Sequence, residues 1–263
     1  MKQQILSLLP GDHPWQNHIH WFETLDSTNS RAKLLAREGA PHGTVLIAGH
    51  QTVGRGRMGR SFHSPAGSGL YLSVLLRPQC PPEQLMHLTC AAAAAACHAI
   101  ENTCSLRPGI KWTNDLVWDR RKLGGILTEL AILPDCTAAV VGIGINVTQQ
   151  PEDFPPELQS TAGSLAMFCR EVPSRAKLAA NLILALQEMD AQLLTGKAAM
   201  LEFYRQNCIT LDTDVSVVQG DHIRHGRALT VDDQGALVVR FSDGHTEAVN
   251  SGEVSIRGMY GYV

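Results

Sequence analysis

Three arginines and three glycines share the seven residues from Gly54 to Arg60, directly after an apolar run. Arginine carries a planar fork of donors that matches carboxylate and phosphate oxygens, and glycine lets backbone amides approach a ligand closely. The string also fits G-x-G-x-x-G, but that dinucleotide fingerprint needs a helix, which Ser61 to Gly69 cannot open. No Gly-Lys-Ser/Thr follows, which excludes a P-loop. The pattern favours a loop that binds a small anion, with a solvated basic turn as the alternative.

A second group of charged and polar residues is followed by a charged turn and by paired glycines: Lys111-Trp112-Thr113-Asn114-Asp115, then 119–122, then Gly124-Gly125. We expect two strands, over 110–118 and 123–130, joined by the turn as a hairpin. Glycines inside a strand indicate close approach by a ligand or by another backbone. A merely solvated turn is the alternative.

Two further stretches have room or polar groups for a ligand. The quartet 26–29, Asp-Ser-Thr-Asn, precedes a helix expected over 30–37 and holds more polar side chains than one helix cap needs. Capping alone is the alternative for this quartet. The strand expected over 138–147 carries glycines at alternate positions, so one of its faces has space for a flat group.

The composition is that of a globular protein with 44% hydrophobic and 18% charged residues and a formal charge of −3. That charge argues against a general nucleic-acid binder, which needs dense lysine and arginine. Seven cysteines without a C-x-x-C pair fit a reducing compartment. No signal peptide and no unbroken run of about 20 apolar residues is present, so we expect a cytoplasmic protein without a membrane span.

Apolar runs and caps predict the elements that position these groups. Strands are expected over 19–25, 44–49 and 70–76, and helices over 83–100, 174–194 and 198–208. From Leu211 onward, five short strands separated by turns predict a small β-barrel. The expected domains are therefore 1–210 and 211–263, with the boundary near Thr210.

With these stretches together, the chain resembles the biotin–protein ligases. The arginine loop matches the family's G-R-G-R-x-G-R signature, and the later stretches resemble, in the family's order, K-W-P-N-D, K-L-A/G-G-I-L and G-x-G-I-N. Ser27-Thr28-Asn29 resembles its S-T-N triplet. One residue departs from the pattern, since Thr113 stands where the family usually has proline. The lead-in of residues 1–18 is too short for a helix-turn-helix module, so the resemblance is to the monofunctional type without DNA binding.

The resemblance implies an α+β fold, with a mixed sheet flanked by helices, similar to class II synthetases, and an SH3-like barrel at the C-terminus. It implies that biotin and ATP give biotinyl-5'-AMP and pyrophosphate, after which a lysine of biotin carboxyl carrier protein takes the biotinyl group. Mg²⁺ is expected to bridge phosphate oxygens. The sequence assigns no metal ligands and leaves open whether the chain forms a homodimer.

The resemblance also implies roles for individual residues. Lys122, Arg57 and Asp115 are expected to be catalytic, with Asp115 orienting or deprotonating the acceptor lysine. The residues expected to bind biotin are Ser27, Thr28, Asn29, Gln51, Arg55, Gly56, Arg57 and Lys122. Those expected to bind ATP or the adenylate are Arg55, Arg57, Arg60, Lys111, Trp112, Asn114, Asn146 and Arg257.

Two other functions compete with this one. A lipoate or octanoate protein ligase or transferase shares the fold and a central lysine. Its acyl group has no ureido head, however, so Gln51 and the 27–29 triplet would have little to bind. A biotin-sensing regulator that binds DNA is the other competitor, and the basic recognition helix that it needs is not found in the sequence.

Overall fold

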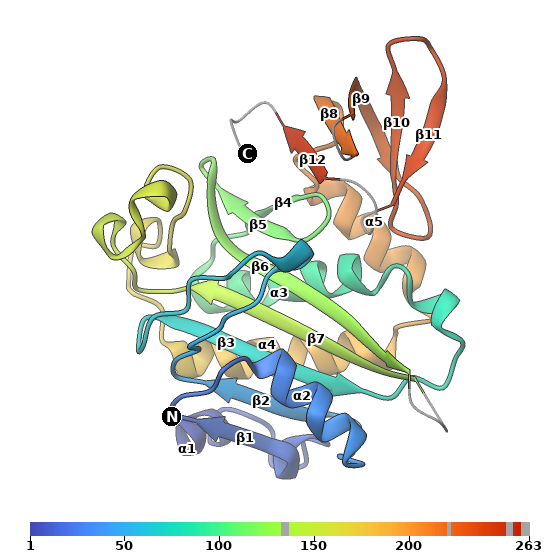
Figure 1. The fold of residues 1–263 in the computed structure, drawn as a ribbon. Helices are drawn as coiled ribbons and strands as arrows, with labels where there is room; N and C mark the ends of the chain where they lie inside the picture. Colours follow the sequence, from blue (N-terminus) through green and yellow to red (C-terminus); the bar gives the residue numbers. More distant parts are fainter. Residues whose placement is uncertain (133–136, 220–221, 251–254, 259–263) are drawn as a thin grey trace.

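The computed structural model describes residues 1–132, 137–219, 222–250 and 255–258. A seven-stranded sheet in the order β1-β2-β3-β7-β6-β5-β4 forms its centre (Figure 1). The strands are β1 (Ile19–Phe22), β2 (Thr44–Ala48), β3 (Gly69–Leu76), β4 (Gly109–Lys111), β5 (Asp115–Trp118), β6 (Arg121–Ile132) and β7 (Thr137–Asn146). β1 pairs with β2 in parallel and all other neighbours are antiparallel, so the sheet is mixed, as predicted.

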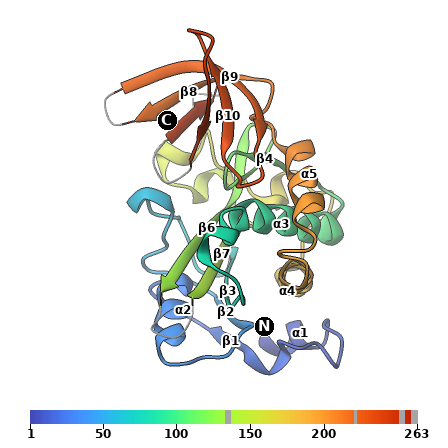
Figure 2. The same ribbon diagram turned by 90° about the vertical axis from the view of Figure 1, so that its right-hand side faces the viewer.

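Helices cover both faces of this sheet. α3 (Leu88–Cys104) and α4 (Arg175–Ala191) lie on one face, and α2 (Thr28–Arg37) lies on the other (Figures 1 and 2). Side chains alternate along a strand, so Leu72 and Val74 of β3 join the core under α3 and α4, while Leu75 packs with α2. α1 (Lys2–Leu6) forms within the lead-in.

The predicted first strand of the hairpin is wrong in one respect. Residues 110–118 form two antiparallel strands, β4 and β5, in which Lys111 lies opposite Asp115. Trp112, Thr113 and Asn114 lie between them, and Asn114 fixes the turn by pairing its backbone and side chain with Ile126 of β6. The extra turn places Lys111 and Asp115 side by side.

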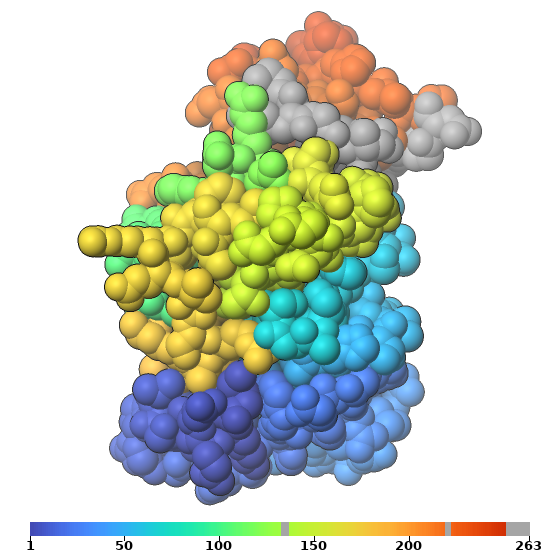
Figure 3. All heavy atoms as spheres, turned by 90° about the vertical axis from the view of Figure 1, so that its left-hand side faces the viewer, coloured from blue at the N-terminus to red at the C-terminus, as the bar shows by residue number. Residues whose placement is uncertain are grey.

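Two other element boundaries differ from the prediction. The helix expected over 83–100 is a short 3₁₀ turn, Pro82–Leu85, followed by α3, which extends to Cys104. β6 begins at Arg121, so Lys122 lies inside a strand instead of in the turn. After β7, the proline-rich chain forms 3₁₀ turns at Pro151–Asp153, Pro156–Leu158 and Leu165–Met167. This segment, yellow-green in Figure 3, covers one face of the molecule between the N-terminal strands and the C-terminal sheet.

The C-terminal part is the second, all-β unit that the turn pattern predicted. After α5 (Lys197–Asn207) come β8 (Asp214–Gln219), β9 (His222–Val231), β10 (Leu237–Phe241), β11 (Thr246–Val249) and β12 (Ser255–Gly258). They form an antiparallel sheet in the order β11-β10-β9-β8-β12, next to α3 and α5 (Figure 2). The observed architecture therefore confirms the predicted fold class.

The C-terminal sheet contacts the turn between β4 and β5. The indole Nε1 of Trp112 donates to the carbonyl of Gly235, in the turn between β9 and β10, at 3.0 Å. The backbone N–H of Trp112 donates to Thr210 Oγ1 at 2.9 Å, and Tyr204 Oη donates to the carbonyl of Thr113 at 3.1 Å. Thr113 is buried, so its hydroxyl does not reach solvent. The pose of the Lys111–Asp115 turn thus depends on contacts from beyond residue 200.

Candidate functional site

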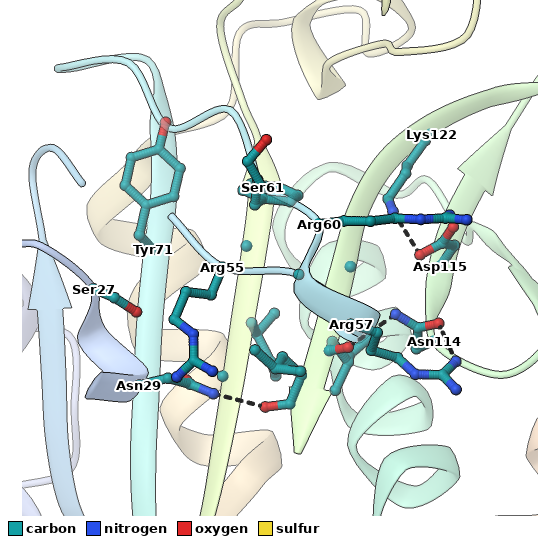
Figure 4. A pocket seen from close by; sticks show the side chains of 18 of the residues that line it. Ser27, Asn29, Arg55, Arg57, Arg60, Ser61, Tyr71, Asn114, Asp115 and Lys122 are labelled. Atoms are coloured by element: carbon teal, nitrogen blue, oxygen red, sulfur yellow. Dashed lines mark hydrogen bonds and ion pairs between the residues drawn. The ribbon is translucent and has the colours of Figure 1, made fainter. Parts of the chain in front are cut away.

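One cavity brings together most of the predicted site residues. It lies where the N-terminus of α2, the arginine loop and the β4–β5 turn meet β6 and β7 (Figure 4). Its neutral end is lined by Ser27, Thr28, Asn29 and Gln51. Its charged end is lined by Arg55, Gly56, Arg57, Arg60, Lys111, Trp112, Asn114, Asp115 and Lys122.

The neutral end starts at the cap of α2. Ser27 is the N-cap residue, and its hydroxyl oxygen accepts a long bond of 3.5 Å from the backbone N–H of Ser30. The next two residues do more than cap. The backbone N–H of Thr28 donates to Gln51 Oε1 at 2.8 Å, and Asn29 reaches across to β6. Capping alone does not account for the quartet.

The partners of Asn29 fix the orientation of its amide. Nδ2 lies 3.0 Å from both the carbonyl of Leu127 and Oε2 of Glu129, and both of these groups accept hydrogen bonds. Oδ1 therefore faces Ser73 Oγ, at 2.7 Å. An amide oxygen can only accept, so the single proton of Ser73 points toward Asn29.

The hydroxyl of Thr28 is part of the same network. Ser73 Oγ also donates to Thr28 Oγ1, at 2.7 Å. Thr28 Oγ1 in turn donates its own proton to Gln51 Oε1, at 3.1 Å, and the same oxygen accepts from the Thr28 backbone N–H. Because its proton is directed to Gln51, Thr28 Oγ1 has a lone pair left for the cavity and suits an N–H donor on the ligand.

Gln51 is held in the same way. Ser64 Oγ donates to the carbonyl of Phe62 at 2.9 Å, so it can accept from Gln51 Nε2 at 3.0 Å. Every polar side chain at this end apart from Ser27 has its hydrogen bonds directed by protein partners. Among the described residues, the Ser27 proton has no acceptor, so this hydroxyl can donate to a carbonyl oxygen of the ligand.

The charged end carries an excess of positive groups. Lys122 Nζ pairs with Asp115 Oδ1 at 2.7 Å, and Arg57 Nη1 donates to Asn114 Oδ1 at 3.0 Å (Figure 4). Asp115 is the one carboxylate among the described lining residues. Burial lowers the pKa of Lys111 to about 8, although attraction to Asp115 opposes the shift. Burial also lowers the pKa of Arg57. Such a site favours a polyanionic ligand.

The arginine loop closes part of the cavity. Its ends pair through Gly56 N–H to Arg60 carbonyl, 2.7 Å, and Phe62 N–H to Gly54 carbonyl, 2.9 Å. Met58, at φ 54°, turns the chain between them, and its side chain is 63% exposed. Arg55 points back to β6, where its Nη1 lies 3.2 Å from Oε1 of Glu129.

The alternate glycines of β7 make room chiefly for the protein's own side chains. A Cβ at Gly142 would collide with the amide of Asn29, and a Cβ at Gly144 would lie 2.6 Å from the ring of Phe62. The expected space for a flat group is therefore partly filled by Asn29 and Phe62. Both glycines still line the cavity.

One predicted site residue, Asn146, does not line the cavity, and another, Arg257, cannot be compared with it. Asn146 is buried, and its Nδ2 donates to the carbonyls of Gly163, at 2.9 Å, and Lys122, at 3.4 Å. It thereby ties the segment after β7 to the backbone beside the central lysine. Arg257 lies in β12, but its side chain is outside the described part of the structure.

Sequence reasoning missed the residues that support the neutral end. Ser73 is fully buried in the apolar strand β3, and Glu129 lies in β6 between leucine, threonine and alanine neighbours. A lone polar residue inside an apolar strand is the one signal that would have pointed to them. Phe62 and Tyr71, which also line the cavity, carry no such signal.

Comparisons with known proteins identify the family to which the chain belongs. Residues 21–146 match the biotin/lipoate A/B protein ligase family, and residues 210–257 match the biotin protein ligase C terminal domain. The bifunctional ligase/repressor BirA of Bacillus subtilis is 35% identical over 229 residues, which cover 86% of this chain and 70% of that protein. The biotin--[acetyl-CoA-carboxylase] ligase of Mycobacterium tuberculosis is 35% identical over 234 residues, which cover 87% of this chain and 85% of that protein.

A solved structure extends the similarity to three dimensions. The biotin protein ligase of Aquifex aeolicus in complex with biotin and ATP matches with a TM-score of 0.78 and 27% identity, covering 92% of this chain and 99% of that chain. The chain therefore belongs to the biotin/lipoate A/B protein ligase family. Within that family, the C-terminal match places it among the biotin protein ligases.

Proposed function

We propose that this chain is an ATP-dependent biotin protein ligase that forms biotinyl-5'-AMP and transfers biotin to a lysine of a biotin carboxyl carrier domain. The observation that carries the proposal is the division of one cavity into a neutral end and a cationic end. A cyclic urea needs both an acceptor for N–H and a donor for C=O, which Thr28 and Ser27 offer. Lipoyl and octanoyl groups lack these atoms and would leave the buried Ser27 hydroxyl without an acceptor and Thr28 Oγ1 without a donor from the ligand, which costs affinity.

In the first step, a carboxylate oxygen of biotin attacks the α-phosphorus of ATP, and pyrophosphate leaves. Two anions must approach each other, so the positive charges of Arg57, Lys111 and Lys122 lower the barrier by offsetting their repulsion. Arg60 and Asn114, at the same end, are assigned to the nucleotide. The indole of Trp112 is tied to Gly235, so we assign it to holding the turn beside the nucleotide.

In the second step, the neutral amine of the acceptor lysine attacks the acyl carbon, the acyl–oxygen bond breaks and AMP leaves. The amine must lose a proton, and Asp115 is the carboxylate that lines the cavity in the described structure. We assign to Asp115 the orientation or deprotonation of that amine. Its partner Lys122, 2.7 Å away, is placed to stabilise negative charge on the reacting carbonyl or phosphate oxygen in both steps.

Mg²⁺ fits this site as part of the nucleotide substrate. No cluster of three or more histidine, cysteine or acidic side chains suited to a metal occurs in the described ranges. Mg²⁺ bound to nucleotides keeps several waters and needs only one or two carboxylates besides phosphate oxygens. We therefore propose that it enters as MgATP on the phosphate oxygens, and we assign it no protein ligand.

The same proposal sets the organisation of the chain. Residues 1–210 would form the catalytic domain and residues 211–263 the C-terminal domain, with Arg257 contributing to the nucleotide side. The structure has no helix among its described residues that is long and apolar enough to cross a membrane. We propose that the reaction, which consumes ATP, takes place in the cytoplasm.

Transfer of labelled biotin to a purified biotin carboxyl carrier domain tests the proposal. We expect label on the carrier only with MgATP, and none on a carrier whose acceptor lysine is replaced by arginine. Labelled octanoate and lipoate in place of biotin are the specificity controls. Equal transfer of octanoate would contradict the assignment of the neutral end.

A further inference from the structure

The carboxylate of Glu129 on β6 joins three parts of the molecule that meet behind the cavity wall. Its oxygens lie 2.7 Å from Lys33 Nζ of α2, 3.0 Å from Asn29 Nδ2 and 3.2 Å from Arg55 Nη1 of the arginine loop. Figure 4 shows Asn29 and the guanidinium of Arg55 on the same side of the cavity. Glu129 itself does not line the cavity.

The carboxylate is held ionised at this place. Burial alone would raise the pKa of Glu129. The hydrogen bonds from Lys33 and Asn29, together with the charges of Lys33 and Arg55, outweigh the burial and hold that pKa below its ordinary value. An ionised carboxylate only accepts hydrogen bonds, which is what the Asn29 amide requires for its oxygen to face Ser73.

The contacts of Glu129 with Asn29 and with Arg55 affect different parts of the proposed reaction. Through Asn29, Glu129 directs the amide oxygen to which Ser73 Oγ donates, and Ser73 Oγ also donates to Thr28 Oγ1 at the cavity wall. Through Arg55, the same carboxylate holds one end of the loop whose next residues, Gly56 and Arg57, line the charged end. Side-chain exposure is 39% for Arg55 but only 19% for Glu129, so the loop is the exposed partner.

We infer that Glu129 is a positioning residue that couples recognition of the biotin head group to the placement of the arginine loop. This inference rests on the proposed function. One carboxylate directs the hydrogen bonds of the neutral end and anchors the loop over the charged end. A loop displaced from Glu129 would leave the adenylate less enclosed, and an unanchored Asn29 would leave Thr28 without a fixed direction.

A purely structural role for Glu129 is the alternative, because its shortest contact ties α2 to β6 through Lys33. The variant Lys33→Met removes that tie and keeps the contacts to Asn29 and Arg55, so it is the matched control. Glu129→Gln keeps the size of the side chain and removes its charge. The remaining cations, Lys33 and Arg55, would then face each other without a counter-charge.

Steady-state kinetics and the loss of preformed biotinyl-5'-AMP are measured for wild type and both variants. For Glu129→Gln we expect KM for biotin and the rate of adenylate loss each to rise about tenfold, as for a lost charge-assisted hydrogen bond, with KM for ATP within about twofold. For Lys33→Met, KM for biotin, KM for ATP and the rate of adenylate loss should each stay within about twofold of the wild-type value. Equal effects of the two variants would overturn the inference, since both would then report support of the fold.

A double-mutant cycle with Arg55→Met isolates the loop contact. The effects of Glu129→Gln and Arg55→Met on adenylate loss should combine to clearly less than their product, because both variants break one contact. Full additivity would overturn the coupling. If Glu129→Gln does not fold, Glu129→Asp in the same cycle keeps the charge and shortens its reach. If the wild-type protein shows no biotin-dependent release of pyrophosphate, the proposed function itself is refuted. Failure of the proposed function can therefore be distinguished from failure of the inference about Glu129.

Discussion

The two ends of the cavity are built in opposite ways. At the neutral end, Asn29, Ser73 and Gln51 have protein partners that fix the direction of each hydrogen bond. At the charged end, five cationic side chains line the cavity, and Asp115 is the one carboxylate among the described lining residues. Apart from the Ser27 proton, the hydrogen bonds of the neutral end are formed before a ligand arrives, whereas the charged end lacks negative charge that ATP and the biotin carboxylate would supply. The neutral end should therefore determine the selectivity for biotin, and the charged end should determine the rate of the reaction.

Loss of Lys122 should produce the largest effect. Lys122→Ala removes the cation beside Asp115, and we expect adenylate formation to fall by about 10²-fold or more, as for one electrostatic stabiliser. Biotin-dependent release of pyrophosphate measures this step. Lys177→Ala, a lysine on α4 away from the cavity, is the control and should retain activity. If Lys122→Ala releases pyrophosphate at nearly the wild-type rate, the charged end does not take part in adenylate formation.

Asp115→Asn should separate the two steps. The amide keeps the shape and removes the base, so transfer should slow by about 10²-fold, the lower range for general base catalysis, and by more than adenylation slows. Single-turnover transfer from preformed adenylate isolates the second step. Equal slowing of both steps would assign Asp115 to the nucleotide or its Mg²⁺ instead.

The pH dependence of ATP use should reflect Lys111. With its pKa lowered to about 8, the ammonium is charged below that pH and loses its charge as the pH rises through it. Phosphates bind the charged form, so KM for ATP should rise as the pH passes 8, by about tenfold one unit above the pKa. KM for biotin should stay flat, because the neutral end does not titrate. Lys111→Arg, which stays charged, should abolish the rise, and its persistence would point to another group.

The smallest effect should come from the C-terminal sheet. Trp112→Phe removes the hydrogen bond to Gly235 and should raise KM for ATP by about threefold, as for one neutral hydrogen bond. KM for biotin should not change, since Gly235 is not among the described residues that line the cavity. Thermal unfolding should show a small loss of stability. A matching rise in both KM values would mean that the two ends are not independent.

Motifs and periodicity predicted much of this site, but not its supporting contacts. The arginine loop and Lys111–Asp115 are recognisable in the sequence by their residue types and spacing, and both line one cavity in the structure. The split into β4 and β5 was missed because the turn depends on the pairing of Asn114 with Ile126, 12 residues further along the chain. Ser73 and Glu129 were missed because their partners lie 44 and 100 residues away, at distances that only strand register determines.

The division of the cavity is tested most directly by comparing Thr28→Val with Lys111→Met. Calorimetry gives the affinity for biotin without ATP, and initial rates give KM for ATP. We predict that Thr28→Val weakens biotin binding by about tenfold or more and leaves KM for ATP within about twofold of wild type. Lys111→Met should raise KM for ATP by about tenfold or more and leave the affinity for biotin within about twofold of wild type. If both variants weaken biotin and ATP alike, the cavity is a single undivided site and the account is contradicted.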